Sequence, residues 1–211
     1  VFAEGFCLDK LWWIFFVSAL GGDLIETFYV RATAGIWMSR SSVLYGPFSI
    51  VWGVGAVLLT VLLRRFSDKE DRYVFLGGFF LGGTYEYLCS VFTEVFLGTT
   101  FWDYSDMAFN IGGRTNLLFC IFWGILALVW VKICYPPLSR MIEKIPPVTG
   151  KVVTWVLVGL MACDVVISAM AMIRYVERAE GVEAENKVGE FLDMEYPDEL
   201  IEWRWENLRI E

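Results

Sequence analysis

Long apolar runs recur along the chain and are separated by short polar segments. A helix needs about 20 mainly apolar residues to cross about 30 Å of hydrocarbon. The clearest run ends at Arg64 and Arg65, and we expect Tyr45-Gly46-Pro47 to form its first turn. A later run reaches Pro136-Pro137, which is expected to stop its helix. The pattern predicts an all-α polytopic membrane domain over residues 1–176, with five transmembrane helices near 11–30, 44–63, 73–97, 115–135 and 152–173.

The composition points to the same environment. Hydrophobic residues make up 57% of the chain, ten residues are tryptophan, and the mean hydropathy is +0.54. Soluble domains are only about 45–50% apolar, so a soluble protein of this size would expose much of the excess to water. The bilayer is the solvent that accepts such a surface, and membrane lipids are therefore the first expected partners.

The acidic charge is concentrated at the C-terminal end. Residues 177–211 contain twelve acidic and four basic residues, and the rest of the chain has thirteen of each. Because no basic footprint is present, nucleic acid is excluded as a partner. We expect residues 177–211 to form an acidic extramembrane tail. Within it, Pro197-Asp198-Glu199 is typical of a helix start, and apolar residues follow at helical spacing. This segment is either a short amphipathic helix at the membrane interface or a helix packed against the protein's own loops.

Basic residues in the loops set the expected orientation. Nine lie on the side of the N-terminus, from Lys10 to Lys151, and five lie on the other side, from Arg31 to Arg178. Such an excess marks the cytoplasmic face. The sequence therefore predicts a multi-pass protein of the cell inner (cytoplasmic) membrane, with the N-terminus inside and the tail outside. Because the chain opens at Val1 rather than Met, we also expect a short preceding segment.

Several kinds of chemistry have no signature in the sequence. There is no histidine, and the five cysteines are scattered without a C-x-x-C pair, so neither a metal site nor a cofactor is expected. No Walker-type phosphate loop is present, so the chain is not expected to energise itself with ATP. The G-x-S-x-G and H-E-x-x-H signatures of common membrane hydrolases are also missing.

Carboxylates inside the apolar runs are the first candidate functional residues. Glu86 and Glu94 lie on one side of the predicted third helix. On the same helix, Gly78 and Gly82 form a small-x-x-x-small pair that lets a neighbouring helix approach closely. An ionised acid at the bilayer centre costs at least about 2.5–3.5 kcal/mol, so each acid should be protonated or paired with a cation. Such acids suit a proton- or cation-handling site, and the alternative is a structural polar cluster that ties helices together.

Three further acids bear on this site. If the predicted first helix packs on the third, Glu26 would join Glu86 or Glu94. Asp23, one turn earlier, is expected to be interfacial and solvated. Asp164 stands alone in the predicted fifth helix, and the sequence leaves open whether it caps a polar contact or belongs to the same cluster.

The segment 101–114, between the predicted third and fourth helices, mixes aromatic and polar side chains. Trp102 and Tyr104 are typical of the aromatic belt at a membrane interface. Asp103 and Asn110 add polar groups to the same segment. We therefore expect this loop to contribute to a binding site.

Arg114 lies at the predicted N-terminus of the fourth helix, where the helix dipole is already positive. A cation in that place needs an anionic partner. The partner is Asp103, Glu94, or the phosphate or carboxylate of a substrate, which arginine binds in a bidentate manner. The structural alternative is an internal Asp–Arg bridge that folds the loop.

A distinctive set of residues occurs in a fixed order along the chain: Glu26, Tyr45-Gly46-Pro47, Glu86-Tyr87, Glu94, Trp102-Asp103-Tyr104-Ser105, Asn110, Gly113-Arg114 and Trp123-Gly124. This order resembles that of a known family, the CmpB-like type IV ABC-transporter proteins. The resemblance runs from about Gly22 to Gly124 and more loosely into the tail. It implies a small bacterial integral membrane protein involved in transport.

Three functions fit these observations. The first is an integral membrane transporter or transporter subunit that uses intramembrane carboxylates to bind a proton, cation or small substrate. Five helices are few for a permease, so a homodimer or a separate ATPase subunit would be needed. The second is a membrane-embedded enzyme acting on a lipid or lipid-linked substrate, with Arg114 holding an anionic head group and Glu94 or Asp103 as general acid or base. The third is a structural or sensory partner protein.

We carry the first function forward as the prediction, with no catalytic residue assigned and no claim that the chain is an enzyme. The candidate substrate- or ion-binding residues are Glu26, Glu86, Glu94, Trp102, Asp103, Tyr104, Asn110 and Arg114.

Overall fold

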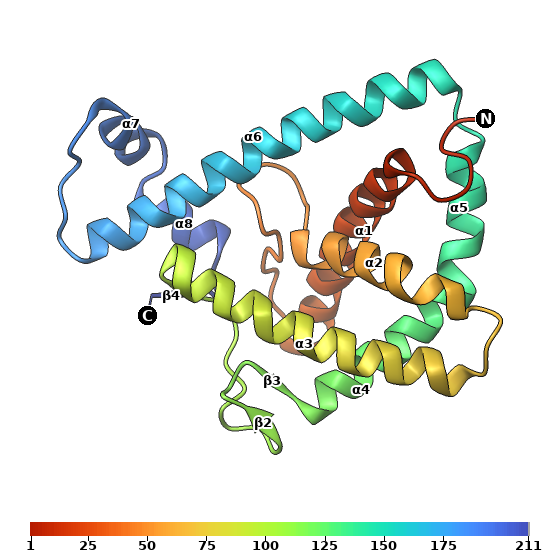
Figure 1. The fold of residues 1–211 in the computed structure, drawn as a ribbon. Coiled ribbons are helices and arrows are strands. Elements are labelled where there is room, and N and C mark those ends of the chain that lie inside the picture. Colours follow the sequence, from red (N-terminus) through yellow and green to blue (C-terminus); the bar gives the residue numbers. More distant parts are fainter. Residues whose placement is uncertain (211) are drawn as a thin grey trace.

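The computed structural model describes residues 1–210 and is mainly helical, which confirms the expected all-α class. In Figure 1, α6 forms one long side, α3 and α4 form the other, and α1 and α2 lie between them. The helices are α1 (Leu8–Ala34), α2 (Ile50–Leu63), a 3₁₀ turn (Arg64–Phe66), α3 (Asp71–Leu97), α4 (Leu117–Val129), a π-helical segment (Trp130–Cys134), α5 (Tyr135–Glu143), α6 (Pro147–Ala179), α7 (Lys187–Glu195) and α8 (Asp198–Arg204). Four short strands form two antiparallel pairs, β1 (Thr99–Thr100) with β4 (Arg209–Ile210) and β2 (Asn110–Ile111) with β3 (Thr115–Asn116).

Within residues 1–210, three helical stretches are long and apolar enough to cross a membrane. They are α1, the continuous stretch Leu117–Glu143, and α6. Helix α2 has 14 residues, about 21 Å at 1.5 Å per residue, which is less than the hydrocarbon thickness. Helix α3 is long enough, but its glycines, tyrosines and three carboxylates lower its apolarity. The chain is thus a membrane protein, and three of the five predicted crossings, those near 11–30, 115–135 and 152–173, meet this criterion in the described part of the chain.

The outward faces of the long helices carry large apolar side chains, as a lipid environment requires. Exposed residues of this kind on α3 and α6 are Phe80, Val95, Phe96, Val152, Trp155, Val156, Leu160 and Val166.

The prediction that Pro136-Pro137 ends the fourth transmembrane helix is wrong. The helix passes through both prolines and continues as α5 to Glu143. The preceding π-helical segment, Trp130–Cys134, changes the backbone register, so the prolines lie in the first turn of α5. Proline is tolerated there because its missing N–H would have no helical partner. At the other end, Asn116 caps α4, because its Oδ1 accepts a hydrogen bond from the Phe119 N–H at 3.0 Å.

Helix α2 begins at Ile50, six residues later than predicted, and Tyr45-Gly46-Pro47 precedes it instead of forming its first turn. The backbone of this loop finds its partners in side chains of α6. The Leu44 N–H donates to Ser168 Oγ at 2.8 Å, and the Tyr45 N–H donates to Asp164 Oδ1 at 3.2 Å. These bonds give the backbone N–H groups partners outside a helix, so the segment stays non-helical up to Ile50.

Helices α3 and α4 are in close contact where the glycine pattern predicts it. A Cβ atom at Gly78 would lie 2.2 Å from the Ala127 Cβ, and one at Gly82 would lie 2.1 Å from the Trp123 Cγ. Only the absence of a side chain allows α4 to lie this close to α3.

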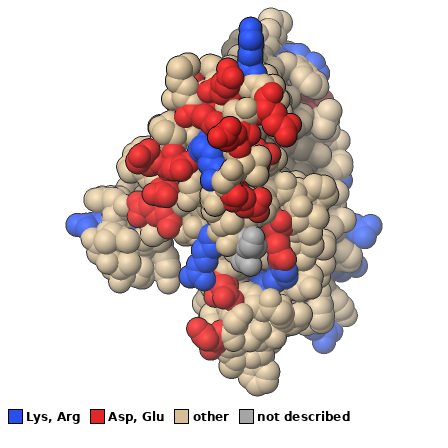
Figure 2. All heavy atoms as spheres, turned by 90° about the vertical axis from the view of Figure 1, so that its left-hand side faces the viewer, with Lys and Arg blue, Asp and Glu red and all other residues tan. Residues whose placement is uncertain are grey.

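The C-terminal segment folds back onto the helical domain. Ile201 and Trp205 are buried against Ala171 and Met172 of α6, together with Leu192 of α7. The sequence left open whether this segment lies at the membrane interface or packs against the protein. In the structure it packs against the protein. Figure 2 shows that acidic side chains gather on the face of the molecule formed by this end.

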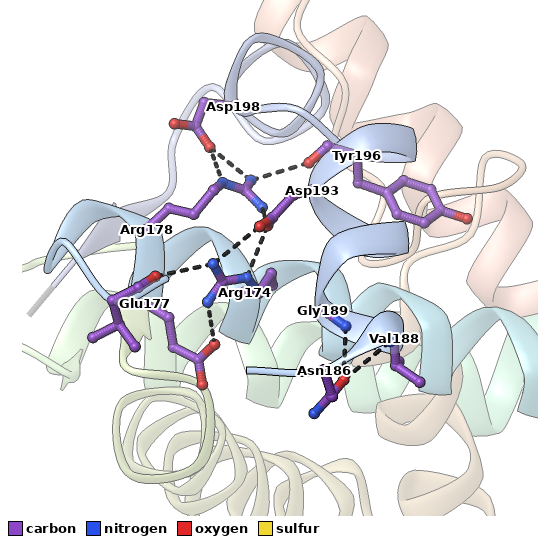
Figure 3. A network of polar contacts seen from close by, with 10 residues as sticks. Arg174, Glu177, Arg178, Asn186, Val188, Gly189, Asp193, Tyr196 and Asp198 are labelled. Carbon is purple, nitrogen blue, oxygen red and sulfur yellow. Dashed lines mark hydrogen bonds and ion pairs between the residues drawn. The ribbon is translucent and has the colours of Figure 1, made fainter. Parts of the chain in front are cut away.

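A network of ion pairs fixes the tail to the end of α6 (Figure 3). Arg174 is only 5% exposed and donates to both carboxylate oxygens of Asp193, at 2.8 and 3.0 Å. Arg178 donates to Asp193 at 2.7 Å and to Asp198 at 2.7 Å. Both guanidiniums bind Asp193 of α7, and Arg178 also binds Asp198 at the start of α8, so the two arginines fix both short helices to the end of α6.

This network predicts that acid loosens the tail. The hydrogen bonds from Arg174, and then those from Arg178, hold the pKa of the Asp193 carboxyl below its ordinary value of 3.8. A carboxyl with a lowered pKa in the folded state stabilises that state above its unfolded pKa, and this stability is lost as the pH falls through the folded pKa. We therefore expect hydrogen exchange of the α7 amides, corrected for intrinsic rates, to speed up below about pH 4.

The matched control for this prediction is Asp193→Asn. This variant should show faster exchange of α7 already at neutral pH and a weaker dependence on pH. Equal protection of α7 in the wild type at neutral pH and at about pH 3 would contradict the prediction.

Candidate substrate cavity

A cavity of about 930 Å³ lies among α2, α3, α4, α6 and the end of the tail. Most of its wall is apolar, which is typical of a ligand site of this size. The apolar wall includes Leu88, Phe92, Phe122, Ile125, Leu126, Val129, Val165 and Met172. Three charged side chains line it, Glu26, Arg40 and Glu86, and the Tyr104 hydroxyl is among the hydroxyl groups of the wall.

Glu86 of α3 is the buried acid of this wall, at 9% exposure. Its Oε1 accepts a hydrogen bond from the Tyr104 hydroxyl at 3.1 Å, and its Oε2 accepts one from the Thr115 hydroxyl at 2.8 Å. Among residues 1–210, no lysine or arginine forms an ion pair with Glu86. The acid is therefore held in place by neutral hydroxyl groups.

Glu26 of α1 reaches the same cavity by a different route from the one expected. Helix α1 packs mainly on α2, and α2 packs on α3. Glu26 forms an ion pair with Arg40, which donates from Nε to Oε2 at 3.1 Å. Glu26 and Glu86 thus line one cavity, as members of two different polar contacts.

Tyr104 links the loop after α3 to this site. Its ring stacks on Phe119 of α4 with the ring centroids 4.5 Å apart. Burial, and then the nearby Glu86 carboxylate, raise the pKa of the Tyr104 hydroxyl above its ordinary value. The hydroxyl therefore keeps its proton and donates a hydrogen bond to Glu86. Trp102 also lines the cavity, and its Nε1 donates to the Arg114 carbonyl oxygen at 2.9 Å.

Arg114 has an internal anionic partner, which is Glu94. The two side chains form an ion pair, and Arg114 Nη1 also donates to Ser90 Oγ at 3.0 Å. The described wall of the cavity contains neither Arg114 nor Glu94. Of the partners considered for Arg114, the structure shows Glu94 of α3.

Asp103 and Asn110 shape the loop between α3 and α4. Asp103 Oδ1 accepts from the Ser105 N–H at 2.9 Å and from its hydroxyl at 2.6 Å, and these bonds hold the pKa of Asp103 below its ordinary value. Asn110 Oδ1 accepts from the Gly113 N–H at 3.0 Å, and Asn110 Nδ2 donates to the Met107 carbonyl oxygen at 2.8 Å. Their contacts are those of turn-forming residues.

Sequence reasoning missed Arg40, Thr115 and Trp205, of which Arg40 and Trp205 line the cavity. Arg40 follows the predicted first helix after a short linker. The acid Glu26 on that helix was therefore the signal in the sequence that a nearby arginine could pair with it. The expectation for Asp23 is wrong, because this residue is only 4% exposed. Asp164, left open by the sequence, caps the loop before α2. Within residues 1–210 no group of three or more His, Cys, Asp and Glu side chains is placed to hold a metal ion.

Comparison with known proteins adds a family to this geometry. The model of the family described as "Putative ABC-transporter type IV" matches residues 13–169, well over half of the 211 residues. The chain belongs to this family. The part matched to the type IV ABC-transporter family contains all the polar cavity residues from Glu26 to Tyr104 and ends within α6, before the tail. No curated protein and no solved structure matched the chain.

Proposed function

We propose that the chain is the membrane-embedded subunit of a transporter and that the cavity binds its substrate. The observation that carries this proposal is the convergence of the Glu26–Arg40 pair, Glu86 and Tyr104 on one large, mainly apolar cavity. Ligand sites commonly combine an apolar wall with a few such polar groups. Membership of a transporter family supports the same function.

The role proposed for the carboxylates is to bind a proton, a cation or a small substrate. A buried acid at membrane depth is expensive unless a proton or a cation neutralises it. Glu26 has Arg40 as its cation, and Glu94 has Arg114. Glu86 is then the acid with free capacity, because its two recorded hydrogen bonds come from neutral hydroxyls.

The enzyme hypothesis has less support. It needs Arg114 to hold an anionic head group, but this guanidinium is bound to Glu94 and Ser90 outside the cavity wall. Asp103, one of its acid–base candidates, is engaged with Ser105. We therefore do not carry this function further.

We also propose five crossings, with the N-terminus inside, the tail outside and a separate ATPase subunit or a second copy as partner. Helix α2 is short, but the two ends of the loop before it are packed in protein, since Ser41, Val43 and Ser49 are buried while Tyr45-Gly46-Pro47 is exposed. Irregular backbone at membrane depth is tolerated when protein surrounds it. The absence of a phosphate-binding loop from the sequence is the reason for proposing a separate ATPase.

Native mass spectrometry of the protein purified in mild detergent tests the substrate site. Ala169 of α6 lines the cavity, so Ala169→Phe should fill it and remove a bound small molecule that the wild type retains. Ala162 lies on the exposed face of the same helix, so Ala162→Phe is the matched control and should retain that molecule. The proposal fails if all three proteins carry the same bound species or if none carries any.

A further inference from the structure

The charges around the cavity do not balance. Glu26 and Arg40 neutralise each other at 3.1 Å, whereas Glu86 contributes a carboxylate that no described lysine or arginine neutralises. Each Glu86 oxygen accepts one recorded hydrogen bond, although a carboxylate offers about four acceptor sites. The wall therefore presents one unneutralised acid to whatever occupies the cavity.

Three aromatic residues of the wall, Tyr85, Trp102 and Trp205, use their polar atoms in hydrogen bonds within the protein. The Tyr85 hydroxyl donates to the Val51 carbonyl oxygen at 2.9 Å, and Trp205 Nε1 donates to the Ser41 carbonyl oxygen at 2.9 Å. Trp102 Nε1 is likewise engaged by a backbone carbonyl. These side chains offer an occupant ring surface and few hydrogen-bond donors, which favours a cation over an anion.

The rest of the wall suits a bulky apolar body. Large side chains of α3 and α4, among them Phe92, Phe122 and Leu126, line it together with Val165 of α6. A cavity of about 930 Å³ is large enough for a molecule of several rings. The size of the cavity, its apolar wall and its unneutralised acid thus suit a bulky apolar molecule with a positive charge.

We propose that the substrate of this cavity is a lipophilic organic cation, with its positive charge beside Glu86 and its apolar body against α4 and α6. This inference rests on the proposed function, because it takes the cavity as the substrate site, and it adds the chemical class. Aromatic rings and a carboxylate together bind a desolvated cation more strongly than either does alone.

Two probes with the same shape and opposite charge test the class. The probes are radiolabelled tetraphenylphosphonium and unlabelled tetraphenylborate, with the full chain reconstituted in lipid nanodiscs. The wild type should bind tetraphenylphosphonium saturably, and tetraphenylborate should not compete. Glu86→Gln keeps the size of the side chain and removes its charge, and it should weaken binding at least about tenfold.

Glu94→Gln is the matched control, because Glu94 lies on the same helix and pairs with Arg114 outside the cavity wall. It should bind the cation within about threefold of the wild type. Gel filtration and circular dichroism check that each variant is folded.

Three results would overturn the inference: equal affinity in the wild type and Glu86→Gln, displacement of the cation by tetraphenylborate, or no saturable binding to the folded wild type. The Ala169→Phe comparison separates this failure from failure of the proposed function. If Ala169→Phe still removes a co-purified molecule while tetraphenylphosphonium does not bind, the cavity remains the substrate site and only the cation class is wrong. If Ala169→Phe changes neither the co-purified molecule nor the binding of tetraphenylphosphonium, both proposals fail.

Discussion

Gly82→Ala is expected to lower the free energy of unfolding by about 2–3 kcal/mol, because the new methyl group overpacks the contact between α3 and α4. The added Cβ would lie 2.1 Å from the Trp123 Cγ and 2.3 Å from its Cβ, so the two helices must separate. Trp123 cannot easily turn away, since its ring packs edge-on against Tyr85 with centroids 5.8 Å apart. Thermal unfolding in one detergent, followed by intrinsic fluorescence and circular dichroism, measures the effect.

The control for this change is Gly21→Ala in α1, where the added methyl group would meet no atom within 4 Å. Alanine is the better helix former, so this variant should match the wild type or gain up to about 1 kcal/mol. Equal unfolding midpoints for the two variants would show that the close contact between α3 and α4 is not a determinant of stability.

Trp205→Ala is expected to release the C-terminal tail. Trp205 is 2% exposed, packs with Ile201 and Met172, and donates from Nε1 to the Ser41 carbonyl oxygen. Truncating a buried tryptophan costs about 3–5 kcal/mol, which is enough to open a segment held by one small cluster. Limited trypsin digestion with mass analysis of the fragments should show rapid cleavage within the tail.

Trp203 provides the comparison, because it lies two residues earlier in α8 and is 68% exposed. Trp203→Ala should be cleaved at the rate of the wild type. If both variants are cleaved equally fast, burial of Trp205 is not what holds the tail.

The sequence predicted the parts of the fold that depend on local pattern. The apolar runs indicated the helices, and the spacing of Gly78 and Gly82 indicated a close helix pair. Both errors at helix ends have a tertiary cause. The loop before α2 is capped by Asp164 and Ser168, which are more than a hundred residues away in the chain. Helix continuation through Pro136-Pro137 depends on a π-helical segment that no apolar period encodes.

The candidate site was likewise predictable only where it depends on the local sequence pattern. An acid in an apolar run stands out, so Glu86 and Glu26 were found, and both line the cavity. Asp103 and Asn110 were selected because turns and binding sites use the same residue types, and the structure places them in hydrogen bonds of the loop. Trp205 was missed as a cavity residue because only the folded tail brings it there.

The pairing of β1 with β4 closes a long ring in the chain. Thr99–Thr100 directly follow the end of α3, and Arg209–Ile210 lie at the end of the tail, so α4, α5 and α6 are all enclosed between two joined strands. Helices α3 and α6, which both line the cavity, are therefore coupled through this ring as well as through their direct contact. Any widening of the cavity that moves α6 away from α3 must stretch the ring, and its first points to yield are the short strand pair and the docked tail.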